Sequence, residues 1–410
     1  MHDLPVVSTH VTPMSSASPS WREWLSVYSV ALGAFAFVTA EYLPVGVLPQ
    51  IAESLHVTDG VAGLMVAVPG IVAAISAPAI ILGAGRMNRR LLLLFLSLLL
   101  VLSNLICAVS PSLPIMLLGR GLLGISLGGF WAVAIAAAGR LVSESRAAKA
   151  TALIFAGITL ATVFGVPFGT FVSTVFSWRM SFVVTAGLGL IALAAQAITL
   201  PSLPSSEGLK ARALRAFLSR GTARRSMLLL GTVVAAHFTG YTYVAPFLGQ
   251  YAGFSPNAIT GVLLGFGLVG MLANFAMAGT LTTHLRASLG AVIVLMVLAQ
   301  LALPHLQGVG VMLAVLVWGV AYGAIPLGVS SWMQLTSPQL PEASSAMLVT
   351  MFQVAIASGS LFGGLMVDHQ GVSAALWLGA GLGLLGLAVM LSFGVARAPI
   401  AQALQRWVSP

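Results

Sequence analysis

The sequence predicts an all-α polytopic membrane protein, with twelve transmembrane helices arranged as two six-helix halves. First, 59% of the 410 residues are hydrophobic and only 7% are charged, against about 25% charged residues in soluble proteins. Second, twelve apolar runs have the length of roughly 20 residues that a helix needs to cross a bilayer. Third, the longest polar segment after the N-terminal tail lies between the sixth and seventh runs. A chain this apolar requires lipid as its solvent.

The twelve runs divide evenly about residue 200. The first six lie near 24–48, 60–84, 91–109, 112–138, 149–173 and 179–200. The other six lie near 227–250, 257–281, 287–304, 309–334, 344–367 and 372–395. We therefore expect a disordered N-terminal tail over 1–22, a first half over 23–200, a basic linker over 201–225, a second half over 226–396 and a C-terminal tail over 397–410.

Basic residues predict the orientation of these helices. With the N-terminus inside, 16 of the 18 Lys and Arg residues fall on the inner side, as the positive-inside rule requires. Among them are three in the loop after the second run, Arg86, Arg89 and Arg90. Both termini are then cytoplasmic. The net charge of +9 is explained by this orientation, so no nucleic-acid partner is expected.

The two halves resemble each other weakly in sequence. Val47–Gly63 aligns without a gap on Val244–Thr260, which places Pro49 on Pro246. Parallel repeats of six helices are typical of one class of alternating-access transporters. The alignment therefore favours an internal duplication.

Glu41 is the acidic residue that lies well inside an apolar run. A charge in hydrocarbon costs roughly 2.5–3.5 kcal/mol on insertion scales, so the residue needs a reason to be there. One interpretation is a proton carrier that faces a central cavity. The other is a side chain near the helix end that extends to water.

Arg120 is the basic residue that lies well inside a run, at a depth comparable to that of Glu41. A pair between the two, or a competition between proton and substrate for Glu41, is geometrically allowed. The alternative is a structural arginine that donates hydrogen bonds to backbone carbonyls.

Aromatic and imidazole side chains form the third set of candidates. His237 and Tyr241 are four residues apart, so they share a helix face, and we expect them to contact substrate. Phe130, Trp131 and Tyr322 lie in the fourth and tenth runs and are candidates for stacking on a planar substrate. Packing alone is the competing interpretation for each of them.

Motifs for catalysis, metal binding or phosphate binding do not occur. There is no Walker sequence, so ATP is not the expected energy source. A membrane enzyme would need clustered catalytic groups, and we expect no catalytic residue, no metal and no cofactor. The single cysteine, Cys107, allows no intrachain disulfide.

The chain resembles the major facilitator superfamily, in its branch of bacterial drug and metabolite proton antiporters. Leu118–Gly124 (LGRGLLG) is similar to the motif whose arginine is implicated in proton transfer, here Arg120. Gly165–Gly169 (GVPFG) resembles the antiporter motif that bends a helix and seals the cavity, with Gly165, Pro167 and Gly169 as its residues. Trp178–Phe182 (WRMSF) fits the family pattern. Gly83–Arg90 (GAGRMNRR) departs from it, because Gly85 stands where the family has an aspartate.

Different segments of the chain resemble two different subfamilies. Glu41–Gly46 (EYLPVG), Gly128–Trp131 (GGFW) and Trp318–Gly328 are similar to purine ribonucleoside efflux pumps, whereas Ala236–Phe247 is similar to sugar efflux transporters. The resemblance implies a proton-driven antiporter of the bacterial inner membrane that exports small polar metabolites, with purine nucleosides first. Sugar efflux, multidrug efflux and uptake by symport stay open. It implies Glu41 and Arg120 as the proton-coupling residues, membrane lipid as surroundings, and a monomer.

Overall fold

The computed structural model describes residues 21–83, 87–204 and 211–393, and these residues form helices with no strand among them. Twelve helical segments are long and apolar enough to cross a membrane. The expected fold class is therefore confirmed, and the chain is a multi-pass membrane protein. Residues 1–20 of the expected tail over 1–22, the whole expected tail over 397–410, and Arg86 lie outside the described residues.

The first half contains six spans. Its helices are α1 (Trp21–Leu55), α2 (Asp59–Ala62) with α3 (Leu64–Gly83), α4 (Arg89–Val109), α5 (Leu113–Leu141), α6 (Ala147–Val175) and α7 (Trp178–Thr199). Helix α2, capped by the Thr58 side chain, and α3 together make the second span, because only Gly63 separates them. The predicted break between the third and fourth spans falls at Ser110–Ser112, where α4 ends and α5 begins.

The second half follows a short helix in the linker. The linker helix is α8 (Ala211–Leu218). The second half contains α9 (Gly221–Tyr241), α10 (Val244–Pro246), the π-helical turn η2 (Phe247–Tyr251), α11 (Pro256–Thr283), α12 (Leu285–Ala302), the 3-10 turn η3 (Leu303–His305), α13 (Val309–Thr336), α14 (Pro341–Gln370) and α15 (Val372–Ser392). Because α9 begins at Gly221, Arg224 and Arg225 of the expected linker are helical residues.

The proposed repeat has a different backbone in each half. Helix α1 continues through Pro44 and Pro49 to Leu55. The seventh span instead stops at Tyr241 and resumes at Val244, and a π-helical turn follows Pro246. Proline removes a backbone donor, yet related prolines leave one span continuous and the other interrupted.

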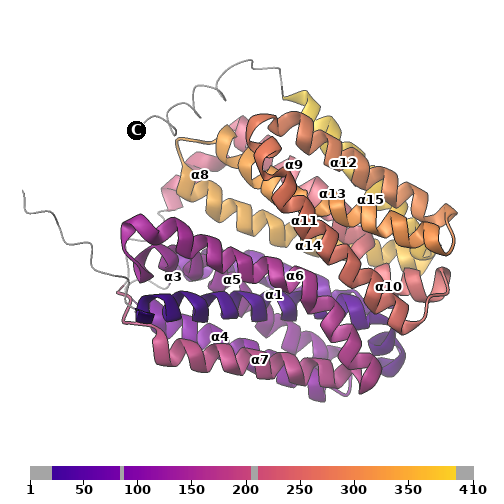
Figure 1. Cartoon of the computed structure of the whole chain (residues 1–410), viewed down its shortest axis with the longest axis horizontal. Helices are drawn as coiled ribbons and strands as arrows, with labels where there is room; N and C mark the ends of the chain where they lie inside the picture. The colour runs from indigo at the N-terminus through magenta and orange to yellow at the C-terminus, as the bar shows by residue number, and fades with distance from the viewer. Residues whose placement is uncertain (1–20, 84–86, 205–210, 394–410) are drawn as a thin grey trace, which may run out of the picture.

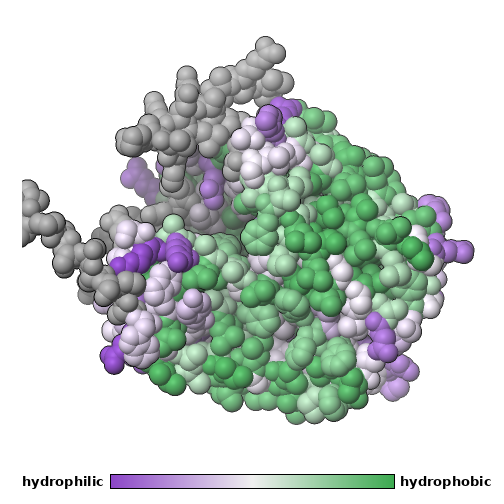
Figure 2. Space-filling model, in the orientation of Figure 1, coloured by the Kyte–Doolittle hydropathy of each residue, from purple (hydrophilic) through white to green (hydrophobic). Residues whose placement is uncertain are grey.

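The two halves meet along one face of each. In Figure 1 the halves form two bundles that converge near α10 and diverge toward α8. They contact each other mainly through α3 with α14 and α6 with α11. The visible face in Figure 2 is hydrophobic across its middle, with hydrophilic residues gathered toward the two ends of the bundles. This distribution matches a protein whose middle lies in hydrocarbon.

Candidate functional site

The candidate site is built around Glu41, on α1 where the two halves face each other. Its side chain is 3% exposed, so it does not extend to water at a helix end. Gln353 of α14, in the other half, and Tyr322 of α13 lie near the carboxyl group. Oε1 of Glu41 nevertheless has no hydrogen-bond partner. A buried carboxyl oxygen with free acceptor capacity can receive a proton.

Arg120 of α5 is also buried, but it does not form an ion pair with the Glu41 carboxylate. Its guanidinium donates to three backbone carbonyls: Nε to Met65 at 2.6 Å, Nη1 to Ala40 at 2.7 Å and Nη2 to Glu41 at 2.8 Å. These contacts fit the second interpretation given for Arg120, a structural arginine that donates hydrogen bonds to backbone carbonyls.

Two prolines explain why these carbonyls need a donor. In an α-helix the N–H of residue i+4 donates to the carbonyl of residue i. The Ala40 carbonyl faces the nitrogen of Pro44, and the Met65 carbonyl faces that of Pro69, and neither proline has an N–H. Arg120 supplies both missing hydrogen bonds with one planar fork. It thus holds the α1 backbone next to Glu41.

An aromatic stack lies on the second half beside this carboxyl group. The His237 ring stacks on Tyr322 with centroids 3.3 Å apart and an angle of 7°, and on Tyr241 at 4.6 Å. Trp318 contacts the imidazole edge-on at 5.4 Å. His237 and Tyr241 are almost fully buried, whereas Tyr322 is half-buried. Tyr322 is therefore the ring of this stack that a substrate could reach, and Nδ1 of His237 has no partner.

Phe130 and Trp131 do not lie equally deep. Phe130 is fully buried in the core of the first half and stacks on Phe37 with centroids 4.3 Å apart. Trp131 packs edge-on against Phe130 and stays half-buried. The packing interpretation fits Phe130, and Trp131 is the member of the pair with accessible surface.

The motif around Pro167 brings α6 against α1. A Cβ atom on Gly165 would lie 3.0 Å from Oγ1 of Thr39, and one on Gly169 would overlap Leu43. Small residues at these two positions let the helices pack closely around the proline in α6. This contact places the motif against the stretch of α1 from Thr39 to Leu43, which contains Glu41.

Of the three loop arginines, Arg89 and Arg90 are described. Arg89 begins α4 and its backbone N–H donates to the Leu203 carbonyl at 2.9 Å. The Arg90 guanidinium donates to the Ala197 carbonyl at 2.7 Å. Both residues therefore attach the start of α4 to the end of the first half, and neither approaches the candidate site.

A set of contacts that no sequence pattern predicted joins the halves at one end of the bundles. The Asp368 carboxylate accepts hydrogen bonds from the Gly60 N–H at 3.0 Å and from the Thr58 hydroxyl at 2.8 Å. Gln250 donates to the Asp59 carboxylate at 2.9 Å. We call this end, defined by these five residues, the closed end.

Glycines make the closed end tight. A Cβ atom on Gly60 would overlap the Gly364 carbonyl, and one on Gly63 would overlap the Tyr243 hydroxyl. That hydroxyl donates to the Ser360 carbonyl at 2.7 Å and lies 3.5 Å from the Gly60 carbonyl. The halves therefore meet with backbone against backbone here.

Changing Gly60 to Ala is expected to open the closed end. The added methyl group has no room, and overpacking costs about 1–3 kcal/mol, enough to populate a conformation with separated halves. Pulsed electron paramagnetic resonance between spin labels at the exposed positions 56 and 369 should show a second, longer distance. In Gly261→Ala, where a Cβ atom meets nothing within 4 Å, the distances should stay unchanged. Unchanged distances in Gly60→Ala would mean that these contacts do not hold the halves together.

Within the described part of the chain, no three His, Cys, Asp or Glu side chains come together as a metal site would require.

Comparison with known proteins agrees with this architecture. The family model described as Major Facilitator Superfamily matches residues 30–347. Two solved structures have the same fold: a bacterial homolog of the human lysosomal transporter Spinster, in an inward-facing and unoccupied conformation, and the human organic anion transporter MFSD10. Their TM-scores are 0.68 and 0.67, at 16% and 18% identity, and they cover 92% and 90% of this chain and 96% and 99% of their own.

Two curated relatives are similar over nearly their whole length. The protein OpdE of Pseudomonas aeruginosa, described as a transcription regulatory protein, is 34% identical over 386 residues, which is 92% of this chain and 95% of OpdE. The purine ribonucleoside efflux pump NepI of Salmonella paratyphi B is 30% identical over 364 residues, which is 88% of this chain and 92% of NepI. With twelve spans, two six-helix halves and the match over residues 30–347, the chain belongs to the major facilitator superfamily of transporters.

Proposed function

We propose that the protein is a proton-coupled antiporter that exports small polar metabolites, most of all purine nucleosides. The observation that carries this proposal is the Glu41 carboxyl group, which is buried between the two halves with one oxygen free of partners. A group in that position can bind a proton from one side and release it to the other as the halves move. Arg120 takes part indirectly, by holding the backbone that carries Glu41.

The aromatic stack supports a planar cargo. Tyr322 presents a half-buried ring beside Glu41, and His237 and Tyr241 stack behind it. Base–aromatic stacking is worth about 1–3 kcal/mol per base. Trp131, on the first half, is a second ring on which a planar cargo would stack. The relatives named purine ribonucleoside efflux pumps support the same class of substrate.

The direction of opening follows from the predicted topology. With the N-terminus in the cytoplasm, the loop that carries Thr58 lies outside, so the closed end faces outward and the cavity opens inward. We place the protein as a monomer in the bacterial cytoplasmic membrane with both termini inside. Gly165, Pro167 and Gly169 then couple the bend of α6 to α1 during the change between states.

Transport by proteoliposomes with an imposed pH gradient tests the function. Purified protein should move radiolabelled inosine in the direction opposite to proton flow. Collapsing the pH gradient with an uncoupler should stop this transport. Arabinose and a lipophilic cation serve as the alternative cargoes. If either one moves faster than inosine in a gradient-dependent way, it replaces nucleosides as the substrate class. Movement of the cargo in the same direction as the protons would indicate a symporter.

Removing the Tyr322 ring is expected to weaken nucleoside binding. Tyr322→Ala should raise the dissociation constant of inosine roughly five- to a hundredfold, as loss of stacking predicts. Tyr322→Phe keeps the ring and should bind as the parent does. Isothermal titration calorimetry on the purified protein measures both. Equal affinity in Tyr322→Ala and the parent would exclude this ring from the substrate site.

A further inference from the structure

The aromatic stack belongs entirely to the second half, because its rings come from α9 and α13. A ligand shifts an equilibrium between two conformations only if it binds one of them more tightly. When the halves rock as rigid bodies, contacts with the stack alone are the same in both conformations. A cargo that drives the movement must therefore also contact the first half, in which Glu41 is assigned to the proton.

Tyr42 of α1 is a ring of the first half that reaches the stack. It packs on Phe238 of α9 with centroids 5.5 Å apart, and Phe238 in turn contacts Tyr322 at 6.1 Å. Tyr42 thus crosses the boundary between the halves and packs against the hydrophobic core of the second half. Trp131, the other ring that the first half contributes to the proposed function, packs against Phe130 within its own half.

Tyr42 and Tyr322 are arranged as a corner and not as two parallel walls. The plane of the Phe238 ring makes an angle of 32° with Tyr42 and of 89° with Tyr322, so the two tyrosine planes are steeply inclined to each other. A planar cargo that stacks on Tyr322 therefore presents its edge to Tyr42. Aromatic groups favour such edge contacts, and the edge of a base also carries its hydrogen-bonding groups.

The hydroxyl group of Tyr42 lies at this corner. It is near the hydroxyls of Tyr322 and Tyr241 and near the Glu41 carboxyl group. Tyr42 and Tyr322 are both half-buried, so each keeps surface that a molecule between the halves can contact. A phenol hydroxyl both donates and accepts hydrogen bonds. It can therefore pair with either kind of group on the edge of the cargo.

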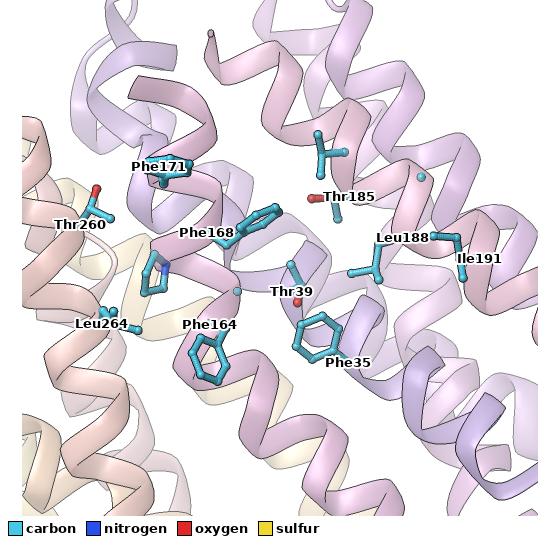
Figure 3. A pocket seen from close by; sticks show the side chains of 14 residues that line it. Phe35, Thr39, Phe164, Phe168, Phe171, Thr185, Leu188, Ile191, Thr260 and Leu264 are labelled. Atoms are coloured by element: carbon cyan, nitrogen blue, oxygen red, sulfur yellow. The ribbon is translucent and has the colours of Figure 1, made fainter. Parts of the chain in front are cut away.

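The groove among α1, α6, α7 and α11 has no comparable polar groups. Figure 3 shows phenyl rings of α6 along it, together with three threonines. Thr185 and Thr260 donate their hydroxyls to carbonyls of their own helices at 2.8 and 3.0 Å, and Thr39 is buried. A polar edge placed there would lose its hydrogen bonds to water without replacement. The corner at Tyr42 is the better place for a cargo that is both planar and polar.

We propose that Tyr42 binds the edge of the cargo and transmits cargo binding to the first half. This inference rests on the planar cargo of the proposed function. The Tyr42 ring contacts the edge of the molecule that stacks on Tyr322, and the Tyr42 hydroxyl forms a hydrogen bond with that edge. Since the two rings belong to different halves, a cargo in the corner favours the conformation in which the halves close around it.

Calorimetric titration with inosine measures what Tyr42 contributes to binding. Tyr42→Phe keeps the packing on Phe238 and removes only the hydroxyl, so the dissociation constant should rise roughly three- to tenfold. Tyr42→Ala also removes the ring and should raise it roughly ten- to a hundredfold. Tyr28, on the same helix, is 54% exposed, and Tyr28→Ala should bind inosine as the parent does.

Pulsed electron paramagnetic resonance tests whether binding is transmitted. Spin labels are placed in a Cys107→Ala background at the exposed positions Ser145, between α5 and α6, and Ser219, between α8 and α9. These positions belong to the ends of the halves opposite the closed end. Saturating inosine should shorten the distance between the labels in the parent and in Tyr28→Ala. In Tyr42→Ala, inosine at a concentration that saturates the weakened site should leave this distance unchanged.

Each result that overturns the inference is distinct. Parental affinity in Tyr42→Phe, which keeps the packing, would exclude the hydrogen bond and the role given to Tyr42. Shortening of the same size in Tyr42→Ala and the parent would show that another residue transmits binding. Both results leave the proposed function standing. A parent protein that binds no inosine would instead overturn the proposed substrate class, and this inference with it.

Discussion

Replacing Glu41 with Gln is expected to reduce gradient-driven export to the leak rate of liposomes without protein. The amide has nearly the shape of the carboxyl group but cannot bind and release a proton. Substrate would still enter the cavity and the halves would still move. Exchange of inosine across the membrane without a pH gradient should therefore continue, which distinguishes loss of coupling from loss of folding.

A matched control lies on the same helix. Glu53 is exposed near the end of α1, and Glu53→Gln should export at the rate of the parent. Both variants are compared in proteoliposomes at equal protein content. Gradient-driven export by Glu41→Gln at the parental rate would show that the proton travels by another route.

Replacing Arg120 with Leu is expected to cause the largest loss of stability. The change leaves the Ala40 and Met65 carbonyls without any donor, because Pro44 and Pro69 have no N–H. A buried group left unpaired costs about 1–3 kcal/mol, so the two together cost about 2–6 kcal/mol. Arg120→Lys should recover little, since one ammonium cannot replace a planar fork that reaches three carbonyls.

A second substitution should rescue part of this loss. In Arg120→Leu with Pro44→Ala, the new N–H of residue 44 can donate to the Ala40 carbonyl, so roughly half of the loss should return. Unfolding in detergent measures each variant. Arg286 also donates to two backbone carbonyls, those of Leu391 and Phe393, but at the surface end of α15. Arg286→Leu should cost less than about 1 kcal/mol. An Arg120→Leu protein as stable as Arg286→Leu would contradict the structural role.

The helices were predictable because the bilayer imposes their length. Runs of about 20 apolar residues place the spans to within several positions, and the break at Ser110–Ser112 was found correctly. The C-terminal end of α1 and the start of α9 were not placed correctly. Helix α1 extends to Leu55 and α9 begins at Gly221, and both added stretches contain polar residues, which hydropathy counts as loop although they still form helix.

The chemistry of the candidate site was predictable only residue by residue. A charge in hydrocarbon singles out Glu41 and Arg120 whatever their surroundings. What Arg120 binds depends on Pro44 and Pro69 lying within reach of one guanidinium, and that distance exists only in the folded protein. In the same way, the contact between Gly60 and Asp368 joins residues more than 300 positions apart, so no local pattern contains it.

The backbone contact at the closed end sets the energy of movement between conformations. Glycines have no side-chain rotamers to restrict when the halves come together, so joining them costs little conformational entropy. When the halves part, water can take the places of the Gly60 N–H and the Thr58 hydroxyl on Asp368, and such an exchange changes the free energy by only about 0.5–1.5 kcal/mol per hydrogen bond. A joint of this kind favours the closed conformation by only about 1–3 kcal/mol. A carrier that must return to its starting shape in every cycle needs that balance, because a strongly preferred conformation would hold it there.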